Sequence, residues 1–185
     1  MIVEGKNAIR RKLLRLRRAM DEEERLKLSR KIKENLFDLP EYGSAEVIMF
    51  YMAHDKEVET REMIADSLCS KRVLLPKVDI EGGKIVPVEI ENLDDVGKGA
   101  FGIEEPRGRE EYSGKIDMVV VPGIAFDLRG YRVGYGKGFY DGFLRDVSSL
   151  KVGLAFDFQV VDHIMEDAND VPMDIVVTEK RIIRC

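Results

Sequence analysis

The sequence predicts an α/β sandwich with a mainly parallel sheet. Short apolar runs alternate along the chain with segments of helical periodicity, which is typical of parallel strands connected by helices. The most apolar run, Ile116–Val121, leads into a glycine-rich loop that opens a further helix. With 185 residues the chain is long enough for one sizeable core, so we expect a single domain over residues 1–185. Helices on both faces of the sheet would give three layers, α/β/α.

Two helices are expected at the start of the chain. Apolar residues repeat at helical spacing between Ile9 and Met20, and the intervening positions are strongly basic, which predicts an amphipathic helix with a cationic outer face. Asp21 and Glu24 have the spacing of a capping box, with Asp in place of Ser or Thr, and should begin a second helix. Pro40 is expected to end it.

The remaining elements follow from apolar runs, turn residues and periodicity. Pro76 should follow a short strand, and Gly82-Gly83 should form a turn. The polar, glycine-containing segment Asp94–Arg109 is predicted to be a loop, within an irregular stretch that reaches Gly114. The same criteria predict strands at 47–52, 73–75, 85–90, 116–121, 152–156 and 175–177, and helices at 60–68 and 138–145.

Composition and charge argue against several classes of protein. The net charge of −5 argues against a nucleic-acid-binding protein, and no apolar run is long enough to span a membrane. Met1 leads into a charged segment, so no signal peptide is expected. Cys69 and Cys185 have no metal-binding spacing, which favours a reduced, cytoplasmic protein without a disulfide.

The loop between Pro122 and Asp141 has a composition that a protein core does not need. Glycines at 130, 134, 136 and 138 are interleaved with Arg132 and Lys137. Glycine lets backbone N–H groups approach phosphate oxygens, and the two cations would neutralise them. Because the loop follows a strand and precedes a helix, we expect it at the carboxyl edge of the sheet, where anions and other ligands bind. Asp141 could hold Mg²⁺ there.

Two common phosphate motifs are excluded by the spacing of this loop. Lys137 is followed by Gly138 rather than by Ser or Thr, so the loop is not a Walker loop. Neither Gly134 nor Gly136 begins a G-x-G-x-x-G fingerprint. The alternative to a phosphate site is a plain tight turn, with Asp141 as an acid that stabilises the start of a helix.

The chain resembles the 5-formyltetrahydrofolate cyclo-ligase family, also called methenyltetrahydrofolate synthetases. The resemblance is carried by the segment 122–141, which reads P-G-I-A-F-D-L-R-G-Y-R-V-G-Y-G-K-G-F-Y-D and has every fixed position of the family signature. It continues in order through Lys6–Arg10, Glu57–Thr60, Gly102–Pro106 and Asp174–Glu179. A pattern of this length is far more specific than a lone glycine motif.

The resemblance implies an ATP-dependent ring closure. In this reaction 5-formyltetrahydrofolate becomes 5,10-methenyltetrahydrofolate, and ATP is split to ADP and phosphate. Mg²⁺ is the implied cofactor and ATP the co-substrate. The implied fold is related to those of sugar-phosphate isomerases and CoA transferases. The expected partners are small molecules only, with no nucleic acid and no membrane, and the expected state is a monomer.

The resemblance also implies roles for individual residues. The implied catalytic residues are Lys137, Arg132 and Tyr140. The implied ATP-binding residues are Lys6, Arg10, Arg132, Gly134, Tyr135, Gly136, Lys137, Gly138, Phe139 and Tyr140. The implied folate-binding residues are Arg10, His54, Glu59, Glu104, Pro106, Tyr135 and Phe139, with Glu59 at the pterin end. The implied metal ligands are Asp141 and Asp174.

Other interpretations of these residues and of the whole chain stay open from the sequence. The basic first helix could be a solvated face, Glu59 an acid at a helix start, and Asp174 a turn residue. His54 and His163 are isolated in the sequence. The chain could also be a nucleotide or folate binder without turnover, a nucleic-acid binder, or another α/β enzyme such as a sugar-phosphate isomerase. Likeness of fold alone does not decide between these functions.

Overall fold

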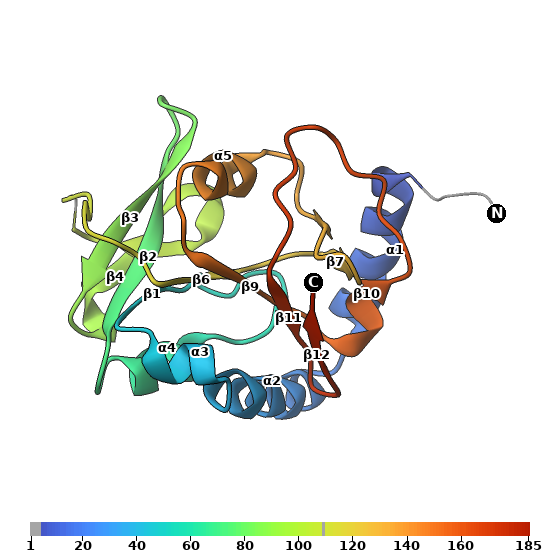
Figure 1. The fold of residues 1–185 in the computed structure, drawn as a ribbon, viewed down its shortest axis with the longest axis horizontal. Helices are drawn as coiled ribbons and strands as arrows, with labels where there is room; N and C mark the ends of the chain where they lie inside the picture. The colour runs from blue at the N-terminus through green and yellow to red at the C-terminus, as the bar shows by residue number, and fades with distance from the viewer. Residues whose placement is uncertain (1–4, 109) are drawn as a thin grey trace.

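A mainly parallel sheet forms the centre of the protein (Figure 1). The computed structural model describes residues 5–108 and 110–185. Across the sheet the strands are β12 (Ile182–Arg184), β11 (Ile175–Val177), β9 (Leu150–Leu154), β6 (Met118–Val121), β1 (Val47–Met49), β2 (Arg72–Asp79) and β3 (Lys84–Ile90). The strands from β11 to β2 run parallel, and β12 and β3 pair antiparallel at the two edges. The predicted α/β class with a mainly parallel sheet is therefore confirmed.

Helices cover both faces of this sheet (Figure 1). One face carries α2 (Glu22–Phe37), α3 (Pro40–Ser44) and α4 (Arg61–Ser67), and the other carries α5 (Phe139–Arg145). Met118 and Val120 of β6 belong to the core beneath α2 and α4, whereas Val119 and Val121 belong to the core beneath Leu144 of α5. Successive side chains of a strand point to opposite faces, so a strand that is apolar throughout needs cover on both.

The first helix, α1 (Lys6–Ala19), packs against a separate small sheet. That sheet consists of β10 (Val160–Val161), β7 (Ala125–Asp127) and β8 (Arg132–Val133). Ile9 and Leu13 of α1 lie in one core with Ala125 and Val133. Because β8 leads directly into the glycines at 134–138, this packing places the basic helix beside the glycine-rich loop. Figure 1 shows α1 next to β7 and β10.

Several predicted boundaries agree with the structure. Oδ2 of Asp21 accepts the N–H groups of Glu23 and Glu24, so Asp21 caps α2 as its spacing predicts. The strand β11 has the predicted bounds. Pro40 does not end α2, which stops at Phe37; it begins α3 instead, where the N–H that proline lacks is not needed.

Two predictions for the middle of the chain are wrong. The strand expected to end before Pro76 continues to Asp79, and Pro76 faces Pro87 of β3. Opposed residues of antiparallel strands alternate between hydrogen-bonded and non-hydrogen-bonded pairs, and two prolines fit the second kind. The segment predicted as a loop contains η1 (Leu93–Asp95), β4 (Val96–Lys98), η2 (Ala100–Gly102) and β5 (Glu104–Pro106), and β4 and β5 pair antiparallel. Residue 109, the end of that predicted loop, lies outside the described residues.

The two cysteines and the end of the chain lie on the surface. Cys69 and Cys185 are free thiols. The N–H of Cys185 donates to the carbonyl of Asp174 at 3.0 Å, which holds the terminal strand β12 beside the start of β11. In the part of the chain that the structure describes, no helix has both the length and the apolar character needed to cross a membrane.

Candidate active site

A cavity of about 470 Å³ lies at the carboxyl end of β6. Pro122 and Gly123, which directly follow this strand, line it together with the glycine loop, defined here as residues 134–138. Further lining residues come from α1, from the segment that follows β1, from β2 and β3, from the segment 101–105, and from Asp167 and Asp170. Ligands of parallel α/β sheets bind at this edge.

Predicted site residues from distant parts of the sequence meet in this cavity. They are Lys6, Arg10, His54, Arg132, Gly134, Tyr135, Gly136, Lys137, Gly138, Phe139, Tyr140 and Asp141. Lys6 and Arg10 reach the glycine loop because α1 packs on the hairpin of β7 and β8 that precedes it. The expectation that the first helix and the glycine loop share a site therefore agrees with the geometry.

The glycine loop has backbone conformations that glycine adopts and other residues resist. Gly136 has φ +93° and Gly138 has φ +71°, both in the left-handed half of conformational space. Gly138 is also the residue from which α5 begins. These two positions explain why the loop needs glycine, independently of any ligand.

Two arginines of α1 hold the loop in place. Nε of Arg10 donates to the carbonyl of Gly134 at 2.8 Å. Arg17, which is only 1% exposed, donates from Nη2 to the hydroxyl of Tyr135 at 2.5 Å and from Nη1 to the carbonyl of Gly123 at 3.4 Å. Nε of Arg17 is buried without a partner among the described residues. α1 thus fixes both the loop and the end of β6.

An ion pair between a buried arginine and a half-buried aspartate lies at the base of the loop. Nη1 of Arg132 is 3.0 Å from Oδ1 of Asp141. The same carboxylate oxygen accepts the N–H of Val171 at 3.1 Å, and Arg132 also donates to the carbonyl of Val171 at 3.2 Å. Within the described residues, the hydrogen bonds of Asp141 all go to Oδ1, so Oδ2 is available to a ligand.

The two lysines of the cavity have different partners. Nζ of Lys6 lies 2.6 Å from Asp167 and 2.5 Å from Asp170. Burial lowers the pKa of Lys6, but the hydrogen bonds that its ammonium donates to the two carboxylates outweigh this effect and raise it. The ammonium of Lys137 instead lies over the ring of Phe101, which is 51% exposed. An ammonium on an aromatic face is held less firmly than one between two carboxylates.

Two predicted ligands, Glu59 and Asp174, lie outside this cavity. Oε1 of Glu59 accepts the N–H groups of Thr60 and Arg61 at the start of α4, and Oε2 pairs with Arg25 at 3.0 Å. Asp174 lies just before β11, away from the carboxyl edge, and accepts the N–H of Lys151 at 2.7 Å. Both carboxylates thus have structural partners. The contacts of Glu59 agree with an acid at a helix start, and those of Asp174 agree with a turn residue.

Glu104 and Pro106, predicted at the folate, also lie outside the cavity. Glu104 pairs with Arg61 at 2.8 Å, and the carbonyl of Pro106 accepts a hydrogen bond from Lys77. Glu105, between them, lines the cavity because successive residues of a strand face opposite sides. The predicted folate contacts of Glu104 and Pro106 therefore lie on the face of this strand that does not line the cavity.

Glu57 is a cavity residue that the sequence did not single out. It lies two positions before Glu59 and is 6% exposed. Burial raises its pKa to about 7, against the opposing effects of Arg17 and of the His54 N–H. The motif contains two glutamates, and no sequence signal distinguishes the one that begins α4 from the one that faces the cavity.

The tyrosines around Glu57 remain protonated over a wide pH range. Burial is the main cause that raises the pKa of Tyr135 to about 12, and it also raises the pKa of Tyr140. Both tyrosines line the cavity. Each therefore offers a hydroxyl donor at neutral pH.

The donor set fits a metal ion that arrives with a nucleotide. Among residues 5–108 and 110–185, no group of three or more His, Cys, Asp or Glu side chains is placed to hold a metal. Magnesium commonly binds through one or two carboxylates together with substrate phosphates and water. Asp141, with its available Oδ2, meets that requirement.

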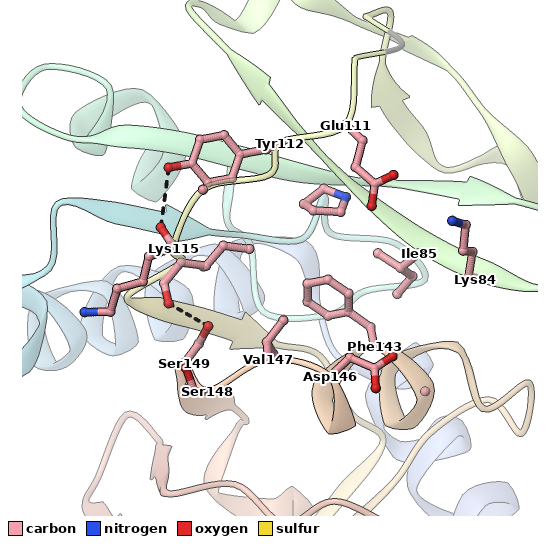
Figure 2. Close-up of a pocket in the computed structure, with 14 residues that line it drawn as sticks. Lys84, Ile85, Glu111, Tyr112, Lys115, Phe143, Asp146, Val147, Ser148 and Ser149 are labelled. Carbon is pink, nitrogen blue, oxygen red and sulfur yellow. Dashed lines mark hydrogen bonds between the residues drawn. The ribbon is translucent and has the colours of Figure 1, made fainter.

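A second cavity of about 430 Å³ lies between the end of α5, β3 and the segment 111–116 (Figure 2). Phe143 of α5 and Asp146, which directly follows this helix, face it, opposite Lys84 of β3 and Tyr112. The Tyr112 hydroxyl donates to the carbonyl of Lys115 at 3.4 Å within this wall. The residues that line it include none of the predicted site residues, so we place the candidate active site in the first cavity.

Comparisons with known proteins give one consistent result. A 5-formyltetrahydrofolate cyclo-ligase from Mus musculus is 28% identical over 95% of this chain and 94% of its own length. The cyclo-ligase of Escherichia coli K12 is 26% identical over 90% of this chain and 96% of its own length.

Solved structures agree with the sequence relatives. The Aquifex aeolicus 5,10-methenyltetrahydrofolate synthetase matches with a TM-score of 0.87 and 41% identity, over 97% of this chain and 92% of that one. The synthetase of Mycoplasma pneumoniae matches with a TM-score of 0.76 and 26% identity, over 95% and 99%. The model of the 5-formyltetrahydrofolate cyclo-ligase family matches residues 2–179. The chain therefore belongs to the 5-formyltetrahydrofolate cyclo-ligase family.

Proposed function

We propose that this protein converts 5-formyltetrahydrofolate to 5,10-methenyltetrahydrofolate, with ATP as co-substrate and ADP and phosphate as products. The cavity is the observation that supports this best. It joins the glycine loop, the cations of α1 and buried aromatic hydroxyls in one space of about 470 Å³. The family to which the chain belongs carries the name of this reaction.

The chemistry explains why ATP is needed. A formyl amide is a poor electrophile, and its oxygen is a poor leaving group. Transfer of the γ-phosphoryl group to that oxygen gives an iminium phosphate, which nitrogen 10 of the folate attacks before phosphate leaves. The protein must therefore align two substrates and neutralise moving negative charge.

The residues around the glycine loop are suited to the phosphates. Lys137 supplies a mobile point charge, and Lys6 and Arg10 supply further cations from α1. Arg132 is buried and fixed by Asp141, so it offers an oriented positive charge to the transferred group. Tyr140 can donate a hydrogen bond to a phosphoryl oxygen, because burial keeps its hydroxyl protonated.

The aromatic residues of the loop are suited to the folate. Tyr135 is 45% exposed at the cavity, and Phe139 lines it from the start of α5. Rings in these positions can stack on a flat heterocycle. His54 and Arg10 complete this side of the proposed site. We leave Glu59, Glu104 and Pro106 out of it, because their contacts lie elsewhere.

Magnesium completes the proposal at Asp141. When bound, it would neutralise charge on the phosphates during transfer. Oδ2 of Asp141 would be its protein ligand, while Arg132 and the N–H of Val171 hold Oδ1. Asp174 is left out, because its carboxylate accepts the N–H of Lys151 away from the cavity.

The proposal also covers the domain organisation, the cellular location, the assembly state and the fold relationship of the protein. We infer that a single domain acts as a cytoplasmic monomer on small molecules, without nucleic acid or membrane partners. The sheet order is compatible with a relation to the sugar-phosphate isomerase and CoA-transferase folds. Sedimentation of the purified protein would test the monomer.

One assay tests the proposed reaction. Purified protein with ATP, Mg²⁺ and 5-formyltetrahydrofolate should produce the absorbance of the methenyl product, and omission of ATP should abolish it. Tight folate binding with no product under these conditions would favour a binding protein and contradict the enzyme. A steep loss of affinity for DNA or RNA with salt would instead favour the nucleic-acid binder.

A further inference from the structure

Glu57 is a buried carboxyl group of the cavity without a salt bridge among the described residues. Its Oε2 accepts the N–H of His54 at 2.9 Å, and no side chain donates to it in the part of the chain that the structure describes. Of the other acids that line the cavity, Asp141 is paired with Arg132, and Asp167 and Asp170 are paired with Lys6. Glu105 also has no salt bridge among the described residues, and it accepts the N–H of Val78 on the β2 side of the cavity. A salt-bridged carboxylate is a weak base, so Glu57 differs in chemistry from the three aspartates.

The backbone before Glu57 turns this side chain into the cavity. Asp55 and Lys56 have φ values of +48° and +57°, an uncommon pair of left-handed residues without glycine. The turn is fixed from α1, where Arg18 binds the Asp55 carboxylate at 2.7 Å, and from α2, where Arg25 donates to the carbonyl of Glu57 at 2.8 Å. Strain of this kind persists where surrounding contacts determine it, and it is concentrated at functional sites.

The groups that face Glu57 come from several elements. Arg17 faces it from α1, and Asp55 and Tyr51 from its own segment. Tyr135 and Tyr140 face it from the glycine loop and from α5. Burial among these groups raises the pKa of Glu57 to about 7, although Arg17 and the His54 N–H act to lower it. Near neutral pH the group can therefore both accept and release a proton.

Ring closure creates a proton that needs an acceptor. Nitrogen 10 of the folate carries one hydrogen when it attacks the iminium carbon. Its lone pair forms the new C–N bond, and the nitrogen becomes a cationic ammonium. The C–O bond then breaks, phosphate departs with that electron pair, and the proton must also leave, because the methenyl product has no hydrogen on this nitrogen. Water is scarce in a filled cavity, so a protein group should take the proton.

We propose that Glu57 is this proton acceptor, a catalytic role that rests on the cyclo-ligase function proposed above. The N10–H bond breaks, its electron pair stays on nitrogen, and the proton passes to an oxygen of the Glu57 carboxylate. The carboxylic acid then returns the proton to solvent after product release. Oε1 is the suited oxygen, since Oε2 already accepts the His54 N–H.

The test compares Glu57→Gln with Glu57→Asp and with Glu59→Gln. Glutamine keeps the shape and the hydrogen bond from His54 but cannot accept the proton. Aspartate keeps the basicity with a shorter reach. Glu59→Gln is the matched control, because Glu59 is a neighbouring carboxylate with partners outside the cavity. Folate affinity is measured by direct titration, so that a binding defect is seen separately from a defect in turnover.

Glu57→Gln should bind folate within about threefold of the original protein and lose roughly 10²-fold or more in kcat. The wild-type kcat should fall as the pH drops through about 7, and we call this fall the acid limb of the pH profile. The acid limb should be absent in Glu57→Gln. It should be present in Glu59→Gln and in Glu57→Asp. A persistent acid limb in Glu57→Gln would overturn the proposal. So would a loss of folate affinity as large as the loss of turnover, which would make Glu57 an anchor for the pterin.

A third variant separates Glu57 from its histidine neighbour. His54→Asn should keep the fall in rate at low pH. If this fall disappears in His54→Asn but persists in Glu57→Gln, the proton acceptor is His54 and the role of Glu57 is contradicted. Absence of product with the unaltered protein would contradict the cyclo-ligase function itself. Absence of wild-type activity is distinguishable from the variant outcomes above, because each of those outcomes requires an active wild-type enzyme.

Discussion

Nη1 of Arg132 lies 3.0 Å from Oδ1 of Asp141, and both side chains are fixed further by the backbone of Val171. One carboxylate oxygen is thereby committed to the protein and the other is left for a ligand. The same pair links the base of the glycine loop to the chain that precedes β11. A change at either residue should therefore affect both metal use and local structure.

Asp141→Asn should raise the Mg²⁺ concentration needed for half-maximal activity by about tenfold or more, because it removes the proposed charged ligand. Titration of activity with Mg²⁺ measures this. Asp174→Asn is the control: it should leave the Mg²⁺ requirement unchanged and lower the melting temperature, since Asp174 accepts the N–H of Lys151. Equal shifts in the two variants would place both residues at the metal.

Lys137→Ala should lower kcat by at least about tenfold while the fold stays intact, since the side chain contributes charge and little packing. Steady-state kinetics and circular dichroism together check this. Lys115→Ala, at the rim of the second cavity and 81% exposed, removes the same charge at a distance and should keep full activity. Full activity of Lys137→Ala would show that this lysine is not near the transferred phosphate.

Gly138→Ala and Gly142→Ala should act in opposite directions. Gly138 has φ +71°, so an alanine there should cost about 1–2 kcal/mol and weaken ATP binding by deforming the loop. Gly142 lies inside α5, and a Cβ there meets no atom within 4 Å, so alanine should stabilise the protein by up to about 1 kcal/mol. Thermal unfolding and the KM for ATP test the pair. Equal stability of the two variants would contradict the conformational argument.

Glu57 should make stability fall as pH rises. Its pKa is about 7 in the folded protein and 4.5 ordinarily, so between these values the folded state holds the proton more firmly than the unfolded state. This contribution is complete below about pH 4.5 and is lost as the pH rises through about 7, with a maximum of about 3 kcal/mol. Urea unfolding at about pH 5 and about pH 8 should show a smaller loss for Glu57→Gln than for the wild type. The same loss in both proteins would contradict a buried, titrating Glu57.

The parts of the fold that the sequence predicts well are those with strong periodicity. β6 is apolar at every position because both faces are covered, and that pattern cannot be satisfied on a surface. β4, β5, β7 and β8 are different: each has two or three residues and depends on its partner strand. Their short runs contain glycine, proline and charged residues, so only tertiary contact reveals them.

The candidate site shows the same division. Gly136, Lys137 and Gly138 are predictable because one contiguous loop carries them, whatever its surroundings. Glu57 and Glu59 are two residues apart. Which of the two side chains faces the cavity depends on where α4 begins and on the turn at Asp55 and Lys56. Those features are set by contacts with α1 and α2, which no local pattern encodes.

If Lys6 binds a polyphosphate as proposed, that binding would exchange one set of anionic partners for another. Its ammonium sits between Asp167 and Asp170, 161 and 164 residues away in the sequence, so the cation is already neutralised. In the proposed function, a phosphate group that binds Lys6 would compete with these two carboxylates for the ammonium, so a highly charged anion would be favoured over a weakly charged one. Loss of the two ion pairs would also remove a contact between α1 and the segment that precedes β11.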